Sequence, residues 1–203
     1  MKLITLRLAL ALAAFTVVPN AFAADSGGGN IFVDATYGKM FGKPATGYTN
    51  DSQSAWGADG GYRWKLDDAD SAGFDVGYMN FGDVDDSGGN EGRDTVSASA
   101  ISAGVNFQHL FGDDKAWIFQ MRGGLMSVKF DTNYYSYFPT STTGTTSSHQ
   151  SGEYFGFGIG RDITQSFRLI LALEYYSAGD SGNYGSDQGL DLGFIGLGAE
   201  YRF

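Results

Sequence analysis

The sequence contains no cysteine and only 3 prolines in 203 residues. The lack of cysteine excludes disulfide bonds, thiolate metal ligands and a cysteine nucleophile. With only 2 histidines, the chain also has few groups for acid–base chemistry near neutral pH. Basic residues are scarce, 13 Lys and Arg against 23 Asp and Glu, and a net charge of −10 argues against binding to nucleic acid. Backbone pairing and side-chain packing must therefore stabilise the protein.

A long apolar run is also missing beyond the N-terminus. Residues 8–18 are apolar and uncharged, but a membrane-spanning helix needs roughly 20 such residues. Two basic residues precede this run, a Pro-Asn pair ends it, and Ala-Phe-Ala follows at positions 21–23, as at a signal-peptide cleavage site. We therefore expect residues 1–23 to be a signal peptide that is removed, and residues 24–203 to form one domain. A retained membrane anchor is the alternative.

Glycine and aromatic residues are abundant: 31 Gly, 16 Phe and 12 Tyr. Aromatic side chains favour strands, and many glycines in a chain with little proline indicate turns and tightly packed strands. Eight segments also alternate between apolar and polar residues, the period that places every second side chain on one face of a sheet. These segments are 31–39, 56–64, 74–78, 101–108, 117–122, 155–160, 168–175 and 195–203.

The connections between these segments alternate in length. The long ones are 40–52, 83–94, 131–152 and 177–189, and the short ones are 66–72, 110–115 and 162–166. Outer-membrane β-barrels show this rhythm, with long extracellular loops and short periplasmic turns. The pattern therefore predicts that both termini lie on the periplasmic side.

The two faces of the expected strands differ in chemistry. One face is apolar or aromatic, and the other carries Asp34, Asp59, Arg63, Asp75, Gln120, Arg122, Glu174 and Glu200. Alternation alone also fits a soluble barrel, but an eight-stranded barrel has room only for side chains, and glycines on the charged face make space for long ones there. We expect an all-β, eight-stranded antiparallel up-and-down transmembrane β-barrel with the charged face inside, because closed barrels pair every backbone group in lipid.

Aromatic residues gather near the expected strand ends, where amphipathic rings favour the depth of lipid headgroups. Ordinary core packing is the alternative explanation. These residues are Tyr37, Trp56, Trp64, Tyr78, Trp117, Tyr175 and Tyr201.

The C-terminal sequence Gly-Leu-Gly-Ala-Glu-Tyr-Arg-Phe, 196–203, resembles the closing strand of bacterial outer-membrane barrels. Segments 55–63, 74–82 and 155–162 extend the resemblance, so the chain is similar to the small OmpA-type and opacity-type barrel family. The resemblance implies that Tyr201 and Phe203 belong to the signal read by the barrel-assembly machinery. Family members often carry an Arg two residues before Glu174, where this chain has Ala172.

We expect the charged face to form a structural network inside the barrel, because an unpaired buried charge costs several kcal/mol. Arg63 and Arg122 should contact Asp59, Asp75, Glu174 or Glu200, and Arg122 or Arg168 is the candidate partner of Glu174. An ion or proton path, or a narrow channel for small apolar molecules, is the alternative. The network residues are Asp59, Arg63, Asp75, Arg122, Glu174 and Glu200.

A catalytic site has few candidates. Ser147, Ser148, His149 and Glu153 invite comparison with lipid-A deacylases, eight-stranded barrels that place Ser, His and Glu on the lipid-facing wall. Here these residues fall in an expected Thr/Ser-rich loop, and His109 begins a short turn. We therefore expect no catalytic residues, no cofactor and no enzymatic activity, with a lipid-modifying enzyme as the alternative.

An acidic cluster contains Asp83, Asp85, Asp86, Glu91 and Asp94. Its spacing does not match a calcium-binding loop, so no metal site is expected. Solvated, mutually repelling charges explain the cluster, and divalent ions that bridge it to lipopolysaccharide are the alternative.

An aromatic tract comprises Tyr134, Tyr135, Tyr137 and Phe138. In a loop it could anchor a surface partner or a carbohydrate, or it could extend the barrel wall. We expect an integral outer-membrane protein, a monomer embedded in lipid and lipopolysaccharide, with a structural or surface-interaction role through its extracellular loops. The surface ligand is not specified by the sequence.

Overall fold

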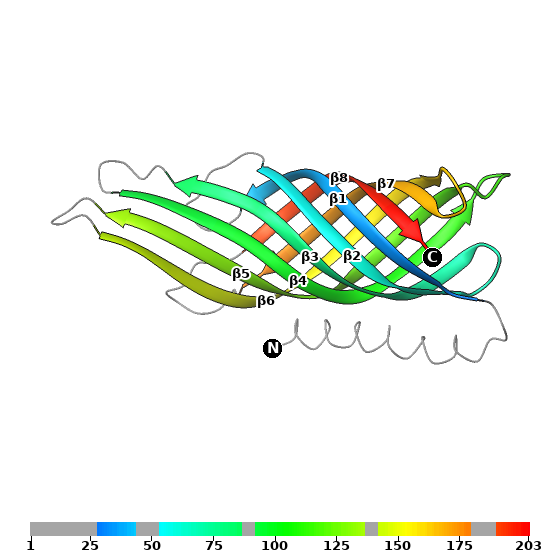
Figure 1. Ribbon diagram of the computed structural model, residues 1–203, viewed down its shortest axis with the longest axis horizontal. Coiled ribbons are helices and arrows are strands. Elements are labelled where there is room, and N and C mark those ends of the chain that lie inside the picture. Colours follow the sequence, from blue (N-terminus) through cyan, green and yellow to red (C-terminus); the bar gives the residue numbers. More distant parts are fainter. Residues whose placement is uncertain (1–27, 44–52, 87–91, 137–141, 180–189) are drawn as a thin grey trace.

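A computed structural model of the chain describes residues 28–43, 53–86, 92–136, 142–179 and 190–203. Eight strands form a closed barrel, in which each strand pairs antiparallel with its neighbours in the sequence and β1 pairs with β8 (Figure 1). The strands are β1 (Asn30–Lys43), β2 (Gln53–Lys65), β3 (Asp70–Asp86), β4 (Gly92–Phe111), β5 (Trp117–Ser136), β6 (Thr142–Asp162), β7 (Phe167–Ala178) and β8 (Leu190–Arg202). The fold class expected from the sequence is confirmed. Within the described ranges, no helix is long and apolar enough to span a membrane.

The alternating sequence explains the orientation of the two faces. Along β7, Leu171 and Leu173 point outward and are about half exposed, whereas Arg168 and Glu174 point inward and are buried. The same holds for β8, where Leu197 is 68% exposed and Glu200 is 0% exposed. The prediction that apolar side chains face away from the lumen and charged ones face into it is therefore confirmed.

The two ends of the barrel differ. The turn end carries the three connections β2–β3, β4–β5 and β6–β7 together with the start of β1 and the end of β8. Asp67 closes the first of these turns by accepting hydrogen bonds from the backbone N–H groups of Ala69 and Asp70, both at 2.7 Å. At the opposite end, the loop end, β1, β3, β5 and β7 end and β2, β4, β6 and β8 begin (Figure 1).

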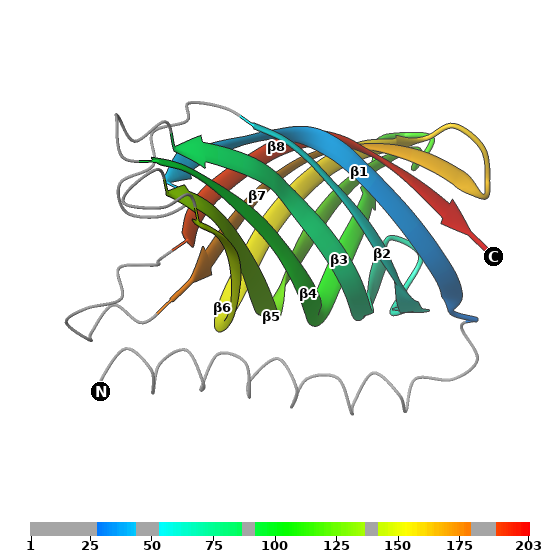
Figure 2. The same cartoon turned by 60° about the vertical axis from the view of Figure 1, so that its left-hand side comes forward.

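Four strands, β3 to β6, continue past the others at the loop end (Figures 1 and 2). Whereas β1, β2, β7 and β8 have 12 to 14 residues, β3 has 17, β4 and β5 have 20 and β6 has 21. Most of the expected loop 131–152 is therefore strand: Asp131 pairs with Ser147, and Ser127 with Ser151. The loop prediction was wrong: residues 131–152 lack the alternation of apolar and polar residues, but their backbone pairing continues. We call residues 92–100, 126–136 and 142–152 the polar extension.

The inside of the barrel has two halves. The half near the turn end holds the charged layer, which comprises Asp34, Asp59, Arg63, Asp75, Arg122, Arg168, Glu174 and Glu200. A few buried apolar side chains, Phe32, Ile118 and Ile170, lie at the same end. The half near the loop end holds an apolar plug of buried side chains, which includes Met40, Met79, Phe81, Met126, Val128, Phe130, Leu190, Leu192 and Phe194. The sequence analysis placed apolar side chains only on the outer face, and the plug corrects that expectation.

Candidate functional site: the charged lumen

The charged layer contains a first cluster around Glu200 on β8. The Glu200 carboxylate lies 2.7 Å from Nη1 of Arg63 and 3.4 Å from Nη1 of Arg168. Arg63 also donates from Nε to Oδ1 of Asn106 at 2.6 Å, and Arg168 donates from Nη1 to Oε1 of Gln108 at 2.6 Å. These side chains come from β2, β4, β7 and β8, so the cluster ties together strands that are not all neighbours.

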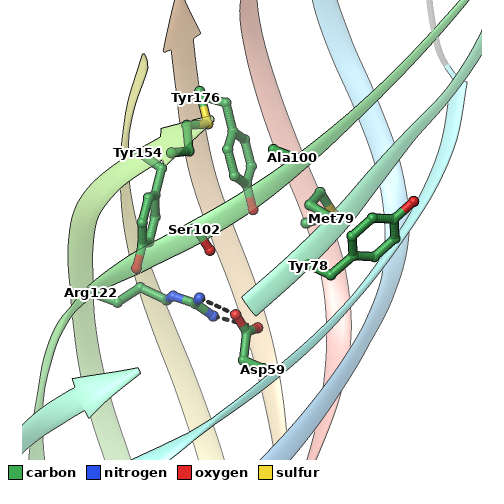
Figure 3. Close-up of a pocket in the computed structure, with 9 residues that line it drawn as sticks. Asp59, Tyr78, Met79, Ala100, Ser102, Arg122, Tyr154 and Tyr176 are labelled. Carbon is green, nitrogen blue, oxygen red and sulfur yellow. Dashed lines mark hydrogen bonds and ion pairs between the residues drawn. The ribbon is translucent and has the colours of Figure 1, made fainter. Parts of the chain in front are cut away.

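A second cluster surrounds Arg122 on β5 (Figure 3). Its guanidinium makes a two-pronged contact with Asp59, at 2.9 Å from Nη1 and 2.6 Å from Nη2. The same guanidinium lies 3.5 Å from a carboxylate oxygen of Asp75 and 3.6 Å from one of Glu174. One cation therefore serves three carboxylates, each from a different strand.

Neutral donors join the two clusters. Tyr154 donates its hydroxyl to Asp75 at 2.8 Å, and the side-chain amide of Asn106 donates to the other oxygen of Asp75 at 2.8 Å. Tyr176 donates its hydroxyl to Glu174. Because Asn106 also accepts from Arg63, the network is continuous from Glu200 to Asp75 and Arg122. Hydrogen bonds to the ionised forms offset part of the desolvation cost of burying these charges.

Glycines on the inward face make room for this network. A Cβ atom at Gly77 would lie 1.9 Å from Oδ1 of Asp59, and one at Gly156 would lie 2.7 Å from Cγ of Glu174. A larger residue at either position would displace a carboxylate from the Arg122 cluster. The glycine-rich inward face is thus a requirement of the charged layer.

A small internal cavity lies where the charged layer meets the apolar plug (Figure 3). Its volume is about 10 Å³, room for about one water molecule. It is lined by residues that include Asp59, Ser102, Arg122, Met126, Tyr154 and Tyr176. The cavity has polar partners for a water, but it is far too small for a solute to pass.

The structure brings the six predicted network residues together in these two clusters. The partner of Glu174 is Arg122, whereas Arg168 binds Glu200 and Asp162 instead. Sequence reasoning missed Asn106, Tyr154 and Tyr176 as members. Alternation along each strand could have placed all three inward. Tyr176 lies two residues from Glu174, and Asn106 and Tyr154 each lie two residues from an inward glycine.

The candidate catalytic residues do not lie in a loop, as the sequence analysis expected; they lie on β6. Ser147, His149 and Glu153 occupy alternate positions on the outward face, and Ser148 lies between the first two on the inward face. Ser147 donates its hydroxyl to Asp131 on β5 at 2.5 Å, so its proton is directed to a carboxylate and not to His149. The outward placement of Ser147, His149 and Glu153 was not expected. In an activated Ser–His–Glu site the serine would instead donate its proton to the histidine.

The remaining candidates lie outside the charged layer. His109, at the turn end of β4, is 47% exposed and lies 2.7 Å from Asp70. The strands β3 and β4 contain Asp83, Asp85, Asp86 and Asp94, and Glu91 lies outside the described residues. Among the described residues, no group of three or more His, Cys, Asp or Glu side chains could hold a metal ion.

The aromatic tract is divided by the end of a strand. Tyr134 and Tyr135 belong to the backbone of β5, where they pair with Gly144 and Thr143, so at these two positions the chain extends the barrel wall. Tyr137 and Phe138 lie outside the described residues.

At the C-terminus, Tyr201 and Phe203 point outward next to one another, with ring centroids 5.0 Å apart. The backbone N–H of Phe203 donates to the carbonyl of Ile31 at 3.0 Å, which fixes the end of the chain to the start of β1. The last strand therefore closes the barrel and exposes both aromatic rings on its outer surface.

Comparison with known proteins identifies the fold. No protein-family model and no curated protein matches the chain. Among solved structures, OprG, an outer-membrane protein of Pseudomonas aeruginosa, superposes with a TM-score of 0.50 at 12% identity over 87% of this chain and 97% of its own. A major outer-membrane protein of Thermus thermophilus has a TM-score of 0.50 at 15% identity, over 87% and 100% of the two chains. The attachment invasion locus protein Ail of Yersinia pestis reaches 0.49 at 16% identity, over 86% and 97%. The chain thus shares its fold with solved outer-membrane β-barrels.

Proposed function

We propose that the chain is an integral outer-membrane protein with its turn end in the periplasm and its loop end outside the cell. The observation that carries this proposal is the outward apolar belt. On β5 the belt runs from Trp117 to Leu125, after which Ser127 and Lys129 face outward. That span is close to the roughly 9–11 residues of a tilted transmembrane strand. A water-soluble barrel would leave these exposed leucine, isoleucine and phenylalanine side chains in water at a large cost.

Aromatic rings at both edges of the belt support its insertion in a bilayer. Tyr37 pairs in register with Trp56, and the Trp56 ring lies 5.5 Å from that of Tyr78, which forms one group near the loop end. Trp117 and Tyr201 lie near the turn end, on β5 and β8. Rings at two levels suit the two interfaces of a bilayer.

The absence of cysteine makes the orientation directly testable. Three single-cysteine variants sample the loop end, the belt and the turn end: Ser147→Cys, Leu171→Cys and Asp113→Cys. In intact cells, a membrane-impermeant maleimide should label only Ser147→Cys; after permeabilisation it should also label Asp113→Cys, and Leu171→Cys should stay unlabelled. Labelling of Asp113→Cys alone in intact cells would show the opposite orientation. A heat-modifiability gel checks that each variant is folded.

The role that fits this architecture best is a structural or surface-interaction role at the loop end, without catalysis. Past the belt, the polar extension presents an outward face of hydroxyl, amide and charged side chains, including Lys129, Asp131, Asn133, Thr145 and His149. Such a rigid, paired sheet is a better platform for contacts than a long flexible loop, because less conformational entropy is lost on binding.

The register defines how to remove the tip of this platform cleanly. Deleting residues 132–146 and joining Asp131 to Ser147 through an Asn-Gly turn retains every pair below Asp131–Ser147. Bacteria that display the trimmed protein should lose binding to cultured epithelial cells or cell–cell aggregation relative to the full-length protein, while the heat-modifiability of the barrel is kept. Unchanged behaviour in both assays would remove residues 132–146, the tip of the polar extension, from the proposal.

The two other candidate functions receive less support. Ion pairs and apolar side chains fill the described lumen, which argues against a channel for small molecules. A planar-bilayer recording of the purified protein should show no steady conductance. For a lipid-modifying enzyme, the test is hydrolysis of lipopolysaccharide acyl chains; activity that disappears in Ser147→Ala or His149→Ala would overturn the non-enzymatic assignment.

A further inference from the structure

Asp34 differs from every other carboxylate of the charged layer. Its side chain points into the lumen from β1 and is only 9% exposed. Its Oδ1 atom is buried without a hydrogen-bond partner among the described residues, and no salt bridge links it to them. The other four carboxylates each contact at least one guanidinium: Asp59, Asp75 and Glu174 contact Arg122, and Glu200 contacts Arg63 and Arg168.

The direct neighbours of Asp34 are acids on both sides. In the β1–β2 register Asp34 pairs with Asp59, and in the β1–β8 register it pairs with Glu200. Like charges placed directly opposite on one face of a sheet destabilise it. If Asp34 were ionised, three carboxylates would stand in a row across β8, β1 and β2, buried from water.

The available cations are already engaged. The charged layer holds five carboxylates and three guanidiniums. Arg122, the cation that faces Asp34 across the lumen, is held by both oxygens of Asp59 and lies near Asp75 and Glu174. Glu174 on β7 also faces Asp34 and adds a negative charge. A metal ion is not the remedy, since no group of three or more potential ligand side chains converges in the described part of the chain.

We propose that Asp34 is a proton-binding site of the lumen, and that it is a neutral carboxylic acid at neutral pH in the folded protein. With the proton bound, the Asp34 side chain that lies between Asp59 and Glu200 is uncharged. Because β1 and β8 close the barrel, ionisation of Asp34 at alkaline pH would place the added repulsion at the seam and loosen it. The lumen thus contains a proton-dependent latch for the closing strands.

The first test detects the proton directly. Infrared spectroscopy of the full-length protein in lipid vesicles should show the C=O stretching band of a protonated carboxyl at pH 7, and this band should be absent from Asp34→Asn. Asp162→Asn is the control and should retain it, because Asp162 pairs with Arg168 and Arg202 and not with Arg122 or Asp34. If wild type lacks the band at pH 7, the proposal is overturned without reference to any variant, so a failure of Asp34→Asn to fold leaves it testable.

The second test uses stability. A carboxyl that holds a proton when folded and loses it on unfolding makes unfolding easier as the pH rises. Above about pH 5, where an unfolded aspartate is ionised, the ratio of the wild-type to the Asp34→Asn unfolding constant should therefore grow about tenfold per pH unit. It should level off once Asp34 ionises in the folded state. Parallel curves for the two proteins, or a dependence on sodium in place of pH, would overturn the proposal.

Discussion

The two halves of the lumen are filled differently: charged side chains dominate the half near the turn end, and apolar side chains fill the half near the loop end. The charged layer near the turn end depends on the exact positions of its side chains, because each carboxylate of the Arg122 cluster must reach the same guanidinium. A shift of a side chain by a few ångströms would leave a buried charge unpaired. The apolar plug near the loop end needs only side chains that together fill the available volume, since residues such as Phe130 and Phe194 have no polar side-chain atoms that require hydrogen-bond partners. The comparison suggests that the charged layer fixes the register of the strands, whereas the plug seals the lumen.

The largest effect is expected for Arg122→Gln, which leaves Asp59, Asp75 and Glu174 without their shared cation. Breaking a buried ion pair costs about 3–5 kcal/mol. Because three carboxylates lose their cation here, the loss in the free energy of unfolding should lie in the upper part of that range. The free energy of unfolding in urea, measured in lipid vesicles, tests it.

Arg161→Gln is the matched control, because the Arg161–Asp114 contact at 3.7 Å joins two exposed side chains. Its loss should change the free energy of unfolding by less than about 1 kcal/mol. Equal losses for the two arginine variants would contradict the view that the charged layer controls stability.

The next largest effect is expected for Phe194→Ala in the apolar plug, where the side chain is 0% exposed. Removing a buried phenylalanine costs about 3–5 kcal/mol, and the nearby Met and Leu side chains can partly fill the space, so we expect about 3 kcal/mol. Urea unfolding measures it, and Ile195→Ala, on the outward face, is the control with the smaller expected loss. A loss larger than that of Arg122→Gln would reverse the ranking of the two halves.

A smaller effect should follow from Tyr154→Phe, which removes the hydroxyl that donates to Asp75 but keeps the ring. Asp75 retains its hydrogen bond from Asn106 and its proximity to Arg122, so the loss should be about 1–2 kcal/mol. Tyr201→Phe, whose ring lies on the outer surface, is the control. In a double-mutant cycle with Asp75→Asn, the two losses should not add; strict additivity would show that the contact contributes nothing.

The smallest effect concerns the turn end, outside both halves. Backbone N–H groups of Ala69 and Asp70 lower the pKa of Asp67. A carboxylate with a lowered pKa in the folded state stabilises the fold above its unfolded pKa and ceases to do so as the pH falls through the folded value. Asp67→Ala should therefore destabilise slightly at pH 7 and not at pH 2. A loss that is the same at both values would mean that the ionised carboxylate is not involved.

Much of the architecture could be predicted from the sequence, and the reason is the period of two. Eight alternating segments, and the charge on one face of six of them, were enough for a closed barrel with Arg122 and Glu174 inside and Leu171 outside. The polar extension could not be predicted in the same way. Around Ser147, serine and threonine occupy both faces, so the apolar signal disappears while the strand continues.

The apolar plug was missed for a related reason. Val128 and Phe130 share the inward face of β5 with Arg122, but the sequence-based strand ended at Arg122, so their orientation was not considered. Extending the alternation by a few residues would have placed them in the lumen. The pairing of Arg168 with Glu200 instead of Glu174 carried no such signal, because it depends on the register between β7 and β8, in which Arg168 lies directly opposite Glu200, and alternation within one strand does not reveal that register.

The sequence by itself determined the number of strands, their antiparallel order and the side on which charge would lie, because side chains alternate on any strand whatever its neighbours are. Only the tertiary structure decided how far β4, β5 and β6 continue, which half of the lumen is apolar and which arginine serves which carboxylate. Those outcomes depend on the register between strands and on the closure of β1 against β8, which bring together residues far apart in the chain.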